Sequence, residues 1–429
     1  MEDSQKAFGF WRGWALAVGC AIGSGIFMMP TLLAPYGMLG QAGWLTAGGG
    51  AILIALLLSR MSKRVTKSGG PYAYAQAGLG KFAGFLIAWT YWISCVAAVA
   101  GISVAFVGYL GYFFPSLAGD NITNLILTLL LVWGIVLLNI RSVEGSGSFL
   151  LVTTVLKILP LLLIAVFGLA TADPQNLPEY NPTDLHPIAL LATVTMLVQW
   201  SFLGIETATV PSGNMVDPKK NIPRIMIASV LTILVIYLLV SLAISYTVPA
   251  SELMGSQAPF TLAAERLLGP IGGAIIAIGA MVSTLGSLNA NCFTAGQMPL
   301  AAAKDNLFPA RFAKLNKAGA PVASFMLCGG VSSILLMMNF TKGLVGAFTF
   351  MILLSTLSTL IAYTFSNVAE FYFLKDEERG PAFTRTLILS ICTFAYTLFA
   401  IWGAGQEVVF YSFFLILIGM PLYALVREE

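Results

Sequence analysis

The sequence predicts an all-α membrane protein with twelve transmembrane helices. Three observations predict it: the composition, a series of long apolar segments, and the distribution of basic residues. Of the 429 residues, 58% are hydrophobic and only 10% are charged, whereas a soluble domain carries roughly 25% charged residues. Most side chains must therefore face lipid or other protein groups. The net charge of +3 is small and dispersed, so we expect no nucleic-acid partner.

Twelve segments are long and apolar enough to cross the hydrocarbon core, which takes about 20 residues. The segment at 262–300 is too long for one straight crossing, so we expect part of it at an interface or in a loop. The twelve segments lie near residues 12–34, 39–60, 82–114, 122–140, 147–171, 188–213, 224–248, 262–300, 322–341, 343–372, 384–404 and 406–427.

The basic residues predict the orientation. Twelve spans put both termini on one side, and if that side is the cytoplasm, inner segments hold 19 of the 22 Lys and Arg residues. The outer segments hold only Arg266 and Lys342, and Lys157 lies inside a span. Because short cytoplasmic loops are enriched in Lys and Arg, we expect a multi-pass protein of the cell inner membrane with both termini cytoplasmic.

The outer loop at 172–187 is polar, Pro-rich and free of Lys and Arg, and it divides the chain. Residues 1–171 would hold the N-terminal segment and a first five-helix repeat, and residues 188–372 a second repeat. Spans 1–5 and 6–10 would then have opposite topology, which is the 5+5 inverted repeat of many transporters. Residues 373–429 would form the last two helices.

The cysteines and the single histidine indicate no metal chemistry. Five cysteines lie in apolar runs without a CxxC spacing, and the one histidine, His186, lies in a loop. We expect no disulfide framework, no metal site and no cofactor. The N-terminus lacks a small-residue cleavage site before the first apolar run, so we expect this run to stay in the mature protein.

The first span contains a break in the helix. It reads GCAIGSGIFMMP, with Gly23, Ser24 and Gly25 in succession. Non-helical backbone at this depth survives only where it lines a cavity or packs in protein. An unwound segment exposes N–H groups at the start of the next half-helix, and these bind a carboxylate well. The alternative is close helix packing through small residues.

The sixth span is interrupted in the same way, because VQWSFLGIETATV carries Gly204 and Glu206 near its middle. Two interrupted segments in corresponding positions of two halves are a pointer to a transporter binding site. We therefore predict that spans 1 and 6 are both broken and that they form the site together.

Two ionisable residues lie far from the ends of their spans. Charged groups at this depth are costly and usually functional. Glu206 is the acidic one, and a buried carboxyl suits proton binding; alternatively, it caps the broken backbone. Lys157 is the basic one, and we expect its ammonium to take the position of a bound cation; alternatively, it reaches an interface.

The motifs resemble those of the amino acid–polyamine–organocation superfamily, and within it the basic amino acid/polyamine antiporter family with its arginine/agmatine antiporters. The resemblance runs from about residue 8 to 427. It rests on GSGIFMMPTLLA, SGGPYAYA, WSFLGIETA, DPKKNIPR and AGQMPLAAAKDNLFP–KLNKAGAPV.

The resemblance implies a substrate site made largely of backbone. The substrate carboxylate would lie at Ile22, Ser24 and Gly25. Its amino group would bind carbonyl groups around Trp200, Phe202 and Ile205. Tyr91, Glu206 and Tyr363 would form a gate of aromatic and acidic side chains.

The resemblance also implies contacts to the substrate side chain, where Cys95 and Ser355 match the family pattern. Two positions depart from it: Asn291 replaces a tryptophan that would stack on a guanidinium, and Val99 replaces an asparagine. These departures favour neutral or small polar amino acids over arginine; arginine is the alternative. Lys157 resembles the lysine that replaces sodium in sodium-independent carriers of the superfamily.

We therefore expect a secondary active amino-acid transporter that works by alternating access, without sodium, by amino acid/amine exchange or proton coupling. The alternatives are a broad-specificity neutral amino-acid permease, a sodium symporter, and a membrane amino-acid receptor or channel. No catalytic constellation is present, so we expect no enzyme. The expected partners are small amino acids or amines, protons and the lipid bilayer, and a homodimer is one alternative for the oligomeric state.

Overall fold

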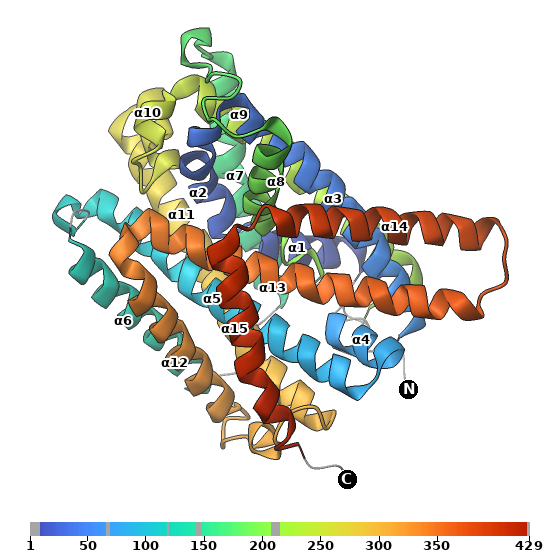
Figure 1. Cartoon of the computed structure of the whole chain (residues 1–429). Helices are drawn as coiled ribbons and strands as arrows, with labels where there is room; N and C mark the ends of the chain where they lie inside the picture. The colour runs from blue at the N-terminus through green and yellow to red at the C-terminus, as the bar shows by residue number, and fades with distance from the viewer. Residues whose placement is uncertain (1–8, 66–68, 118–119, 142–146, 207–214, 427–429) are drawn as a thin grey trace.

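The computed structural model describes residues 9–65, 69–117, 120–141, 147–206 and 215–426, and the side chains of 117, 147–156, 218 and 219 are not included. These residues form helices and contain no β-strand (Figure 1). The α-helices are α1 Phe10–Ala21, α2 Ser24–Leu33, α3 Gly37–Arg64, α4 Pro71–Leu79, α5 Lys81–Phe113, α6 Asn121–Arg141, α7 Gly147–Ala170, α8 Pro187–Gln199, α9 Pro218–Thr247, α10 Ala250–Leu253, α11 Pro259–Lys304, α12 Val322–Asn339, α13 Gly343–Phe373, α14 Pro381–Trp402 and α15 Gln406–Tyr423.

The helices are long and apolar enough for a multi-pass membrane protein. Within the described residues, eight continuous helical runs can cross a bilayer by length and composition. Two of them, Ser24–Arg64 and Val322–Asp376, are each divided by a 3₁₀ turn, η1 Ala34–Tyr36 and η8 Phe340–Lys342. The predicted all-α membrane class is confirmed.

The predicted long segment at 262–300 lies in α11, which has 46 residues. At about 1.5 Å per residue, a straight helix of this length would exceed twice the roughly 30 Å hydrocarbon core. Gly269 has φ +73° and separates residues 259–268 from the rest of α11. Glycine adopts this left-handed conformation without a Cβ clash, so the bend lies where the sequence permits it.

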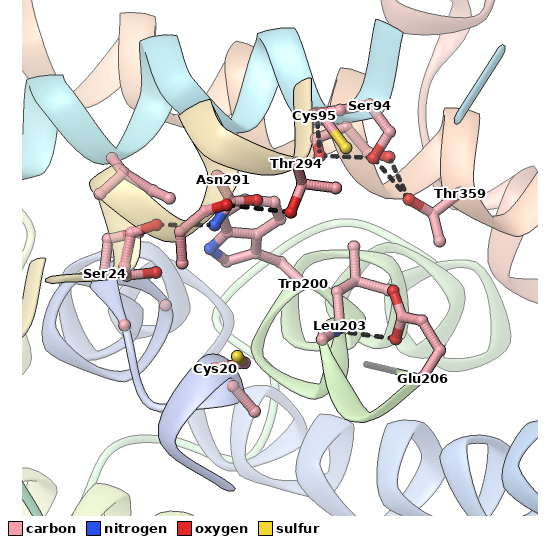
Figure 2. A pocket seen from close by; sticks show the side chains of 18 of the residues that line it. Cys20, Ser24, Ser94, Cys95, Trp200, Leu203, Glu206, Asn291, Thr294 and Thr359 are labelled. Atoms are coloured by element: carbon pink, nitrogen blue, oxygen red, sulfur yellow. Dashed lines mark hydrogen bonds between the residues drawn. The ribbon is translucent and has the colours of Figure 1, made fainter. Parts of the chain in front are cut away.

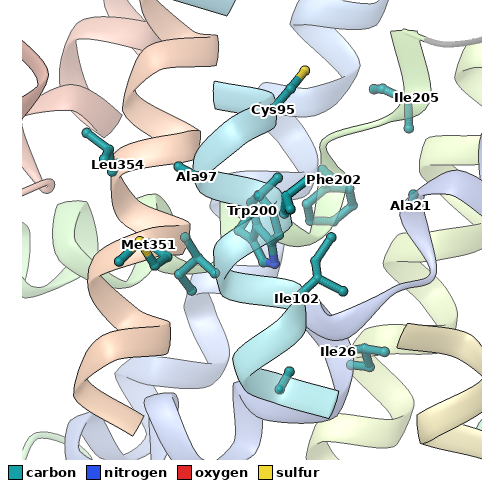
Figure 3. Close-up of a cluster of buried hydrophobic side chains, with 14 of the residues drawn as sticks. Ala21, Ile26, Cys95, Ala97, Ile102, Trp200, Phe202, Ile205, Met351 and Leu354 are labelled. Atoms are coloured by element: carbon teal, nitrogen blue, oxygen red, sulfur yellow. The ribbon is translucent and has the colours of Figure 1, made fainter. Parts of the chain in front are cut away.

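Helix α5 is the centre of the bundle. It packs most extensively against α13 and α11, and most of its side chains are buried. Ala97 of α5 faces Met351 and Leu354 of α13, whereas Ile102 lies on the opposite face of α5, toward Ala21 and Ile26 (Figure 3). By contrast, less than a third of the residues in the apolar windows of α6, α14 and α15 are buried. The outer helices therefore present the faces that suit lipid.

A cluster of four charged residues joins α3 to the end of α13. Glu370 of α13 is fully buried, and its Oε1 lies 2.6 Å from Arg60 Nε and 3.4 Å from Arg64 Nη2. Glu377 pairs with both arginines, at 2.6 Å from Arg60 Nη2. Helix α3 packs mainly on α8 and α9, and α13 mainly on α5 and α4, so these ion pairs connect helices whose main packing partners differ.

Candidate substrate-binding site

Two helix breaks meet in the middle of the bundle. Helix α1 ends at Ala21, Ile22 is extended, and α2 begins at Ser24. Helix α8 passes into the 3₁₀ turn η4 Trp200–Phe202, after which Gly204 has φ +99°. A Cβ on Gly204 would lie 3.3 Å from the carbonyl carbon of Cys20, so the two breaks are in contact. The described part of the sixth predicted span ends at Glu206, because residues 207–213 lie outside the described residues.

A pocket opens between these breaks and three helices, α5, α11 and α13 (Figure 2). Trp200 lies centrally in it, with Ser24 and Asn291 on one side and Leu203 and Glu206 on the other. The residues that line it are Cys20, Ala21, Gly23, Ser24, Gly25, Tyr91, Ser94, Cys95, Ile102, Trp200, Leu203, Gly204, Glu206, Ser287, Ala290, Asn291, Thr294, Ser355 and Thr359.

The start of α2 forms one wall of the pocket. Its N-cap is Gly23, which provides no side-chain hydrogen bond, and the first N–H groups of any helix have no intrahelical partner. The backbone is tightly enclosed: a Cβ on Gly25 would lie 2.8 Å from Ser201 Oγ and 3.1 Å from Trp200 Cδ1. This end of α2 carries partial positive charge and lines the pocket, so it can hold an anion.

The end of α1 is satisfied by side chains from three other helices. Lys157 Nζ of α7 donates to the carbonyl oxygens of Gly19, at 3.1 Å, and Ile22, at 3.3 Å. Ser283 Oγ of α11 donates to the same Ile22 oxygen, and Tyr237 Oη of α9 donates to Ala21 O. A cation at a helix C-terminus is favourable. The ammonium therefore stabilises carbonyl groups that the helix break leaves without intrahelical partners.

Glu206 connects the second break to α5. Its Oε1 accepts a hydrogen bond from Tyr91 Oη at 2.9 Å, and its Oε2 accepts one from the Gly204 N–H at 2.9 Å. The side chain is buried. Tyr363 of α13 is also buried, and it lies close to this carboxyl. Glu206 thus both caps the broken backbone and contacts a pocket-lining tyrosine.

Three hydroxyl groups, which we call the hydroxyl cluster, join α5 to α13 at another wall. Ser355 Oγ donates to Ser94 O at 2.8 Å, and Thr359 Oγ1 donates to Ser355 O at 3.1 Å. Ser94 Oγ lies 3.0 Å from Ser355 Oγ and 2.5 Å from Thr359 Oγ1, and either oxygen of each pair can be the donor. A hydroxyl has one proton and two acceptor lone pairs. The hydroxyl cluster therefore presents acceptors to the pocket.

Two side chains of α11 complete this part of the pocket. Thr294 Oγ1 donates to Ala290 O at 2.9 Å, and Asn291 Nδ2 donates to Ser287 O at 2.9 Å. The Thr294 hydroxyl keeps its lone pairs, and Asn291 keeps its carbonyl oxygen and one amide hydrogen for a ligand.

The pocket contains some of the predicted site residues and not others. Those that line it are Ser24, Gly25, Tyr91, Cys95, Trp200, Glu206, Asn291 and Ser355. Those that do not are Ile22, Lys157, Phe202, Ile205 and Tyr363. Ile22 and Phe202 are fully buried, Ile205 and Tyr363 nearly so, and Lys157 reaches the end of α1 instead.

Sequence reasoning missed Ser94, Thr294 and Thr359. Hydroxyl groups in apolar helices commonly bond to the carbonyl four residues earlier, as Thr294 and Thr359 do here. Such residues give no signal that separates a pocket wall from ordinary packing.

Comparison with known proteins identifies the family. The amino acid permease family matches residues 8–424. The chain belongs to this family. The permease is 29% identical to a putative arginine/ornithine antiporter of Bacillus subtilis (strain 168), over 100% of this chain and 98% of that protein. It is 30% identical to an arginine/ornithine antiporter of Pseudomonas aeruginosa, over 97% and 90%, and 28% identical to the putrescine transporter PotE of Haemophilus influenzae, over 95% and 94%.

These matches extend over nearly the whole of each protein. They place the permease among the basic amino acid/polyamine antiporters, as its motifs predicted. The permease is a membrane transporter rather than an enzyme.

Proposed function

We propose that this permease exchanges amino acids and amines across the cell inner membrane by alternating access. The observation that carries this proposal is the pocket at the meeting point of two helix breaks, one at Ile22–Gly23 and one at Leu203–Gly204. A site at the interface of two broken helices can be exposed to either side by rocking one group of helices against the other.

The proposed topology has twelve spans and a 5+5 inverted repeat, with both termini cytoplasmic. Helices α1 and α2 form the first broken span, and α8 with the segment after η4 forms the sixth. The first repeat ends at residue 171, the second covers 188–372, and residues 373–429 form the last two spans. Lipid covers the exposed apolar side chains of α14 and α15, or a second copy covers part of them in a homodimer.

The backbone of the two breaks recognises the part common to all amino acids. The substrate carboxylate lies at the N–H groups that begin α2, around Ser24 and Gly25. Its amino group lies at the carbonyl groups of η4 and of Ile205. The Trp200 carbonyl already accepts from the Leu203 N–H at 3.2 Å, and a carbonyl has a second lone pair for the substrate.

The hydroxyl cluster supports a substrate side chain that ends in a primary ammonium. Its oxygen lone pairs suit a compact group that only donates hydrogen bonds, as an ammonium does. Asn291 offers a carbonyl oxygen but no aromatic face for a planar guanidinium. The relatives are named for arginine with ornithine, or for putrescine, so their names support a cationic substrate and do not separate an ammonium from a guanidinium. A neutral permease, which Asn291 and Val99 favour in the sequence, is the second candidate, because the pocket wall formed by the hydroxyl cluster, Asn291 and Thr294 has no acidic side chain among the described residues.

A competition assay tests the substrate class. Purified permease in proteoliposomes would be assayed for uptake of labelled ornithine against unlabelled ornithine, arginine, agmatine, putrescine and alanine. We expect ornithine and putrescine to compete best and alanine to compete weakly. Strong competition by alanine together with none by putrescine would establish the neutral permease instead.

Lys157 supports transport without sodium. Its ammonium already lies against the Gly19 and Ile22 carbonyls, so a positive charge is present where a bound cation would otherwise be needed. Uptake should therefore be unchanged when choline replaces sodium on both sides of the vesicle. Loss of most uptake in choline would contradict this role, and a proton gradient applied in the same assay measures whether protons are coupled.

A further inference from the structure

A groove lies on the surface between the start of α1 and the first turns of α9, remote from the substrate pocket. It has a volume of about 540 Å³ and is lined by Phe10, Asn221, Arg224, Ile227, Ala228 and Leu231. The two helices are joined beside it, because Trp14 Nε1 donates to Thr232 Oγ1 at 3.3 Å. The groove is thus a fixed feature of the α1–α9 contact.

The lining changes from polar to apolar along α9. Arg224, Ile227, Ala228 and Leu231 share a face, because they are spaced by three or four residues. Val235 and Leu239 continue this face, and with Leu231 they are exposed apolar side chains. From Ile227 to Leu239 the stripe is about 18 Å long at 1.5 Å per residue, close to half of a hydrocarbon core of roughly 30 Å.

The polar end of the groove is basic. Lys220 and Arg224 are both exposed and lie one turn apart on α9, and Arg224 makes no ion pair with a described residue. The one acidic residue in the described parts of α1, α9 and residues 215–217 is Asp217, whose backbone carbonyl accepts bonds from the first turn of α9. Trp11 is 69% exposed beside this end, and tryptophan is typical of the membrane–water interface.

We propose that this groove binds one anionic phospholipid of the inner leaflet. The phosphate lies at Arg224 and Lys220, and one acyl chain follows the apolar stripe from Ile227 to Leu239. The charge of the rim selects an anionic headgroup over a zwitterionic one, and the length of the stripe fits one leaflet. Neither feature depends on the substrate pocket, so the lipid site is independent of the proposed transport function.

Native mass spectrometry of the permease extracted from vesicles of mixed phosphatidylglycerol and phosphatidylcholine tests the site. We expect one retained phosphatidylglycerol, which inorganic phosphate does not displace. Arg224→Gln should lower its retention about fivefold, because the attraction of one basic side chain to an anionic surface changes binding affinity by about this factor. Ala228→Phe, which fills the groove without changing charge, should lower it as well.

The matched control is Arg385→Gln, which removes another exposed basic residue of the predicted inner side, in the first turns of α14. It should leave retention unchanged. Equal losses in Arg224→Gln and Arg385→Gln would mean that only general membrane electrostatics acts, and would overturn the proposal. Equal retention of the two lipids by the wild type, or full retention in Ala228→Phe, would overturn it too. Size-exclusion profiles and substrate binding of each variant establish that it is folded.

Discussion

At the residue scale, the start of α2 is the position where the sequence was most informative. Three small residues in succession within an apolar span predicted a break there, and Ile22 and Gly23 do separate α1 from α2. Backbone N–H and C=O groups within a membrane span must all be hydrogen-bonded. A break in the helix therefore needs other groups that bond to the freed carbonyl oxygens. Lys157, Tyr237 and Ser283 provide these groups.

The carboxylate placement predicts the effect of Gly25→Val. A Cβ at this position would meet Ser201 Oγ at 2.8 Å, and the added methyl groups would cover the N–H groups that begin α2. Hydrogen bonds to a charged group contribute about 1.5–3 kcal/mol, so substrate affinity should fall at least about tenfold. The control is Gly49→Val in α3, where a Cβ meets no atom within 4 Å. Wild-type affinity in Gly25→Val would refute the placement.

Glu206 is predicted to couple protonation to the gate. Its contacts to Tyr91 and Gly204 join the broken helix to α5, and a change of charge would alter both. A group that interacts differently with two conformations is what a switch requires. Glu206→Gln keeps the shape and removes the titration, so it should bind substrate but lose much of the pH dependence of exchange.

Binding and exchange rates at several pH values for wild type and Glu206→Gln would test this role. If the variant binds substrate and its exchange follows the wild-type pH curve, Glu206 is only a cap of the broken backbone. Lys157 would then be the next residue to test.

At the element scale, the lengths of the apolar segments predicted most of the helices. The features of the structure that were not predicted each have a local cause. The nine-residue α4 was not predicted, because a helix this short has no clear apolar period, although Pro71 follows two glycines at its start. The bend in α11 was expected only as an excess of length; the positive φ of Gly269 fixes its position. The charge cluster between α3 and α13 was also missed, since sequence does not reveal which distant charges meet.

That cluster should contribute strongly to stability. Glu370 is fully buried, while Arg60 and Arg64 remain 31% and 25% exposed. Removing one partner of a buried ion pair costs about 3–5 kcal/mol, and the partial solvation of the arginines favours the lower end. Glu370→Gln should therefore lower the apparent Tm in detergent clearly.

Glu252→Gln is the matched control for Glu370→Gln. Glu252 pairs with Arg266 at 2.5 Å but both side chains are exposed, and such a pair contributes about 0–1 kcal/mol. Its apparent Tm should stay close to that of the wild type. Equal shifts in the two variants would show that the buried cluster does not hold α3 to α13.

At the scale of the whole molecule, composition and basic-residue asymmetry were enough to predict a multi-pass membrane protein. The motifs were enough to predict the family, which the full-length relatives bear out. The inverted repeat stays a prediction, because it rests on span parity and on two matched breaks rather than on similar residues in the two halves. Substrate preference could not be read from residue identities alone, since the direction of each hydroxyl proton depends on contacts between α5, α11 and α13.

The central claim is that the permease exchanges one substrate for another, and efflux from preloaded proteoliposomes tests it most directly. Vesicles loaded with labelled ornithine would be diluted into choline buffer with or without external ornithine or putrescine. We predict slow efflux into plain buffer and rapid efflux when either compound is present outside, because the pocket must be occupied to reorient in an exchanger. Efflux that is equally fast with and without external substrate would contradict exchange and indicate a uniporter or a channel.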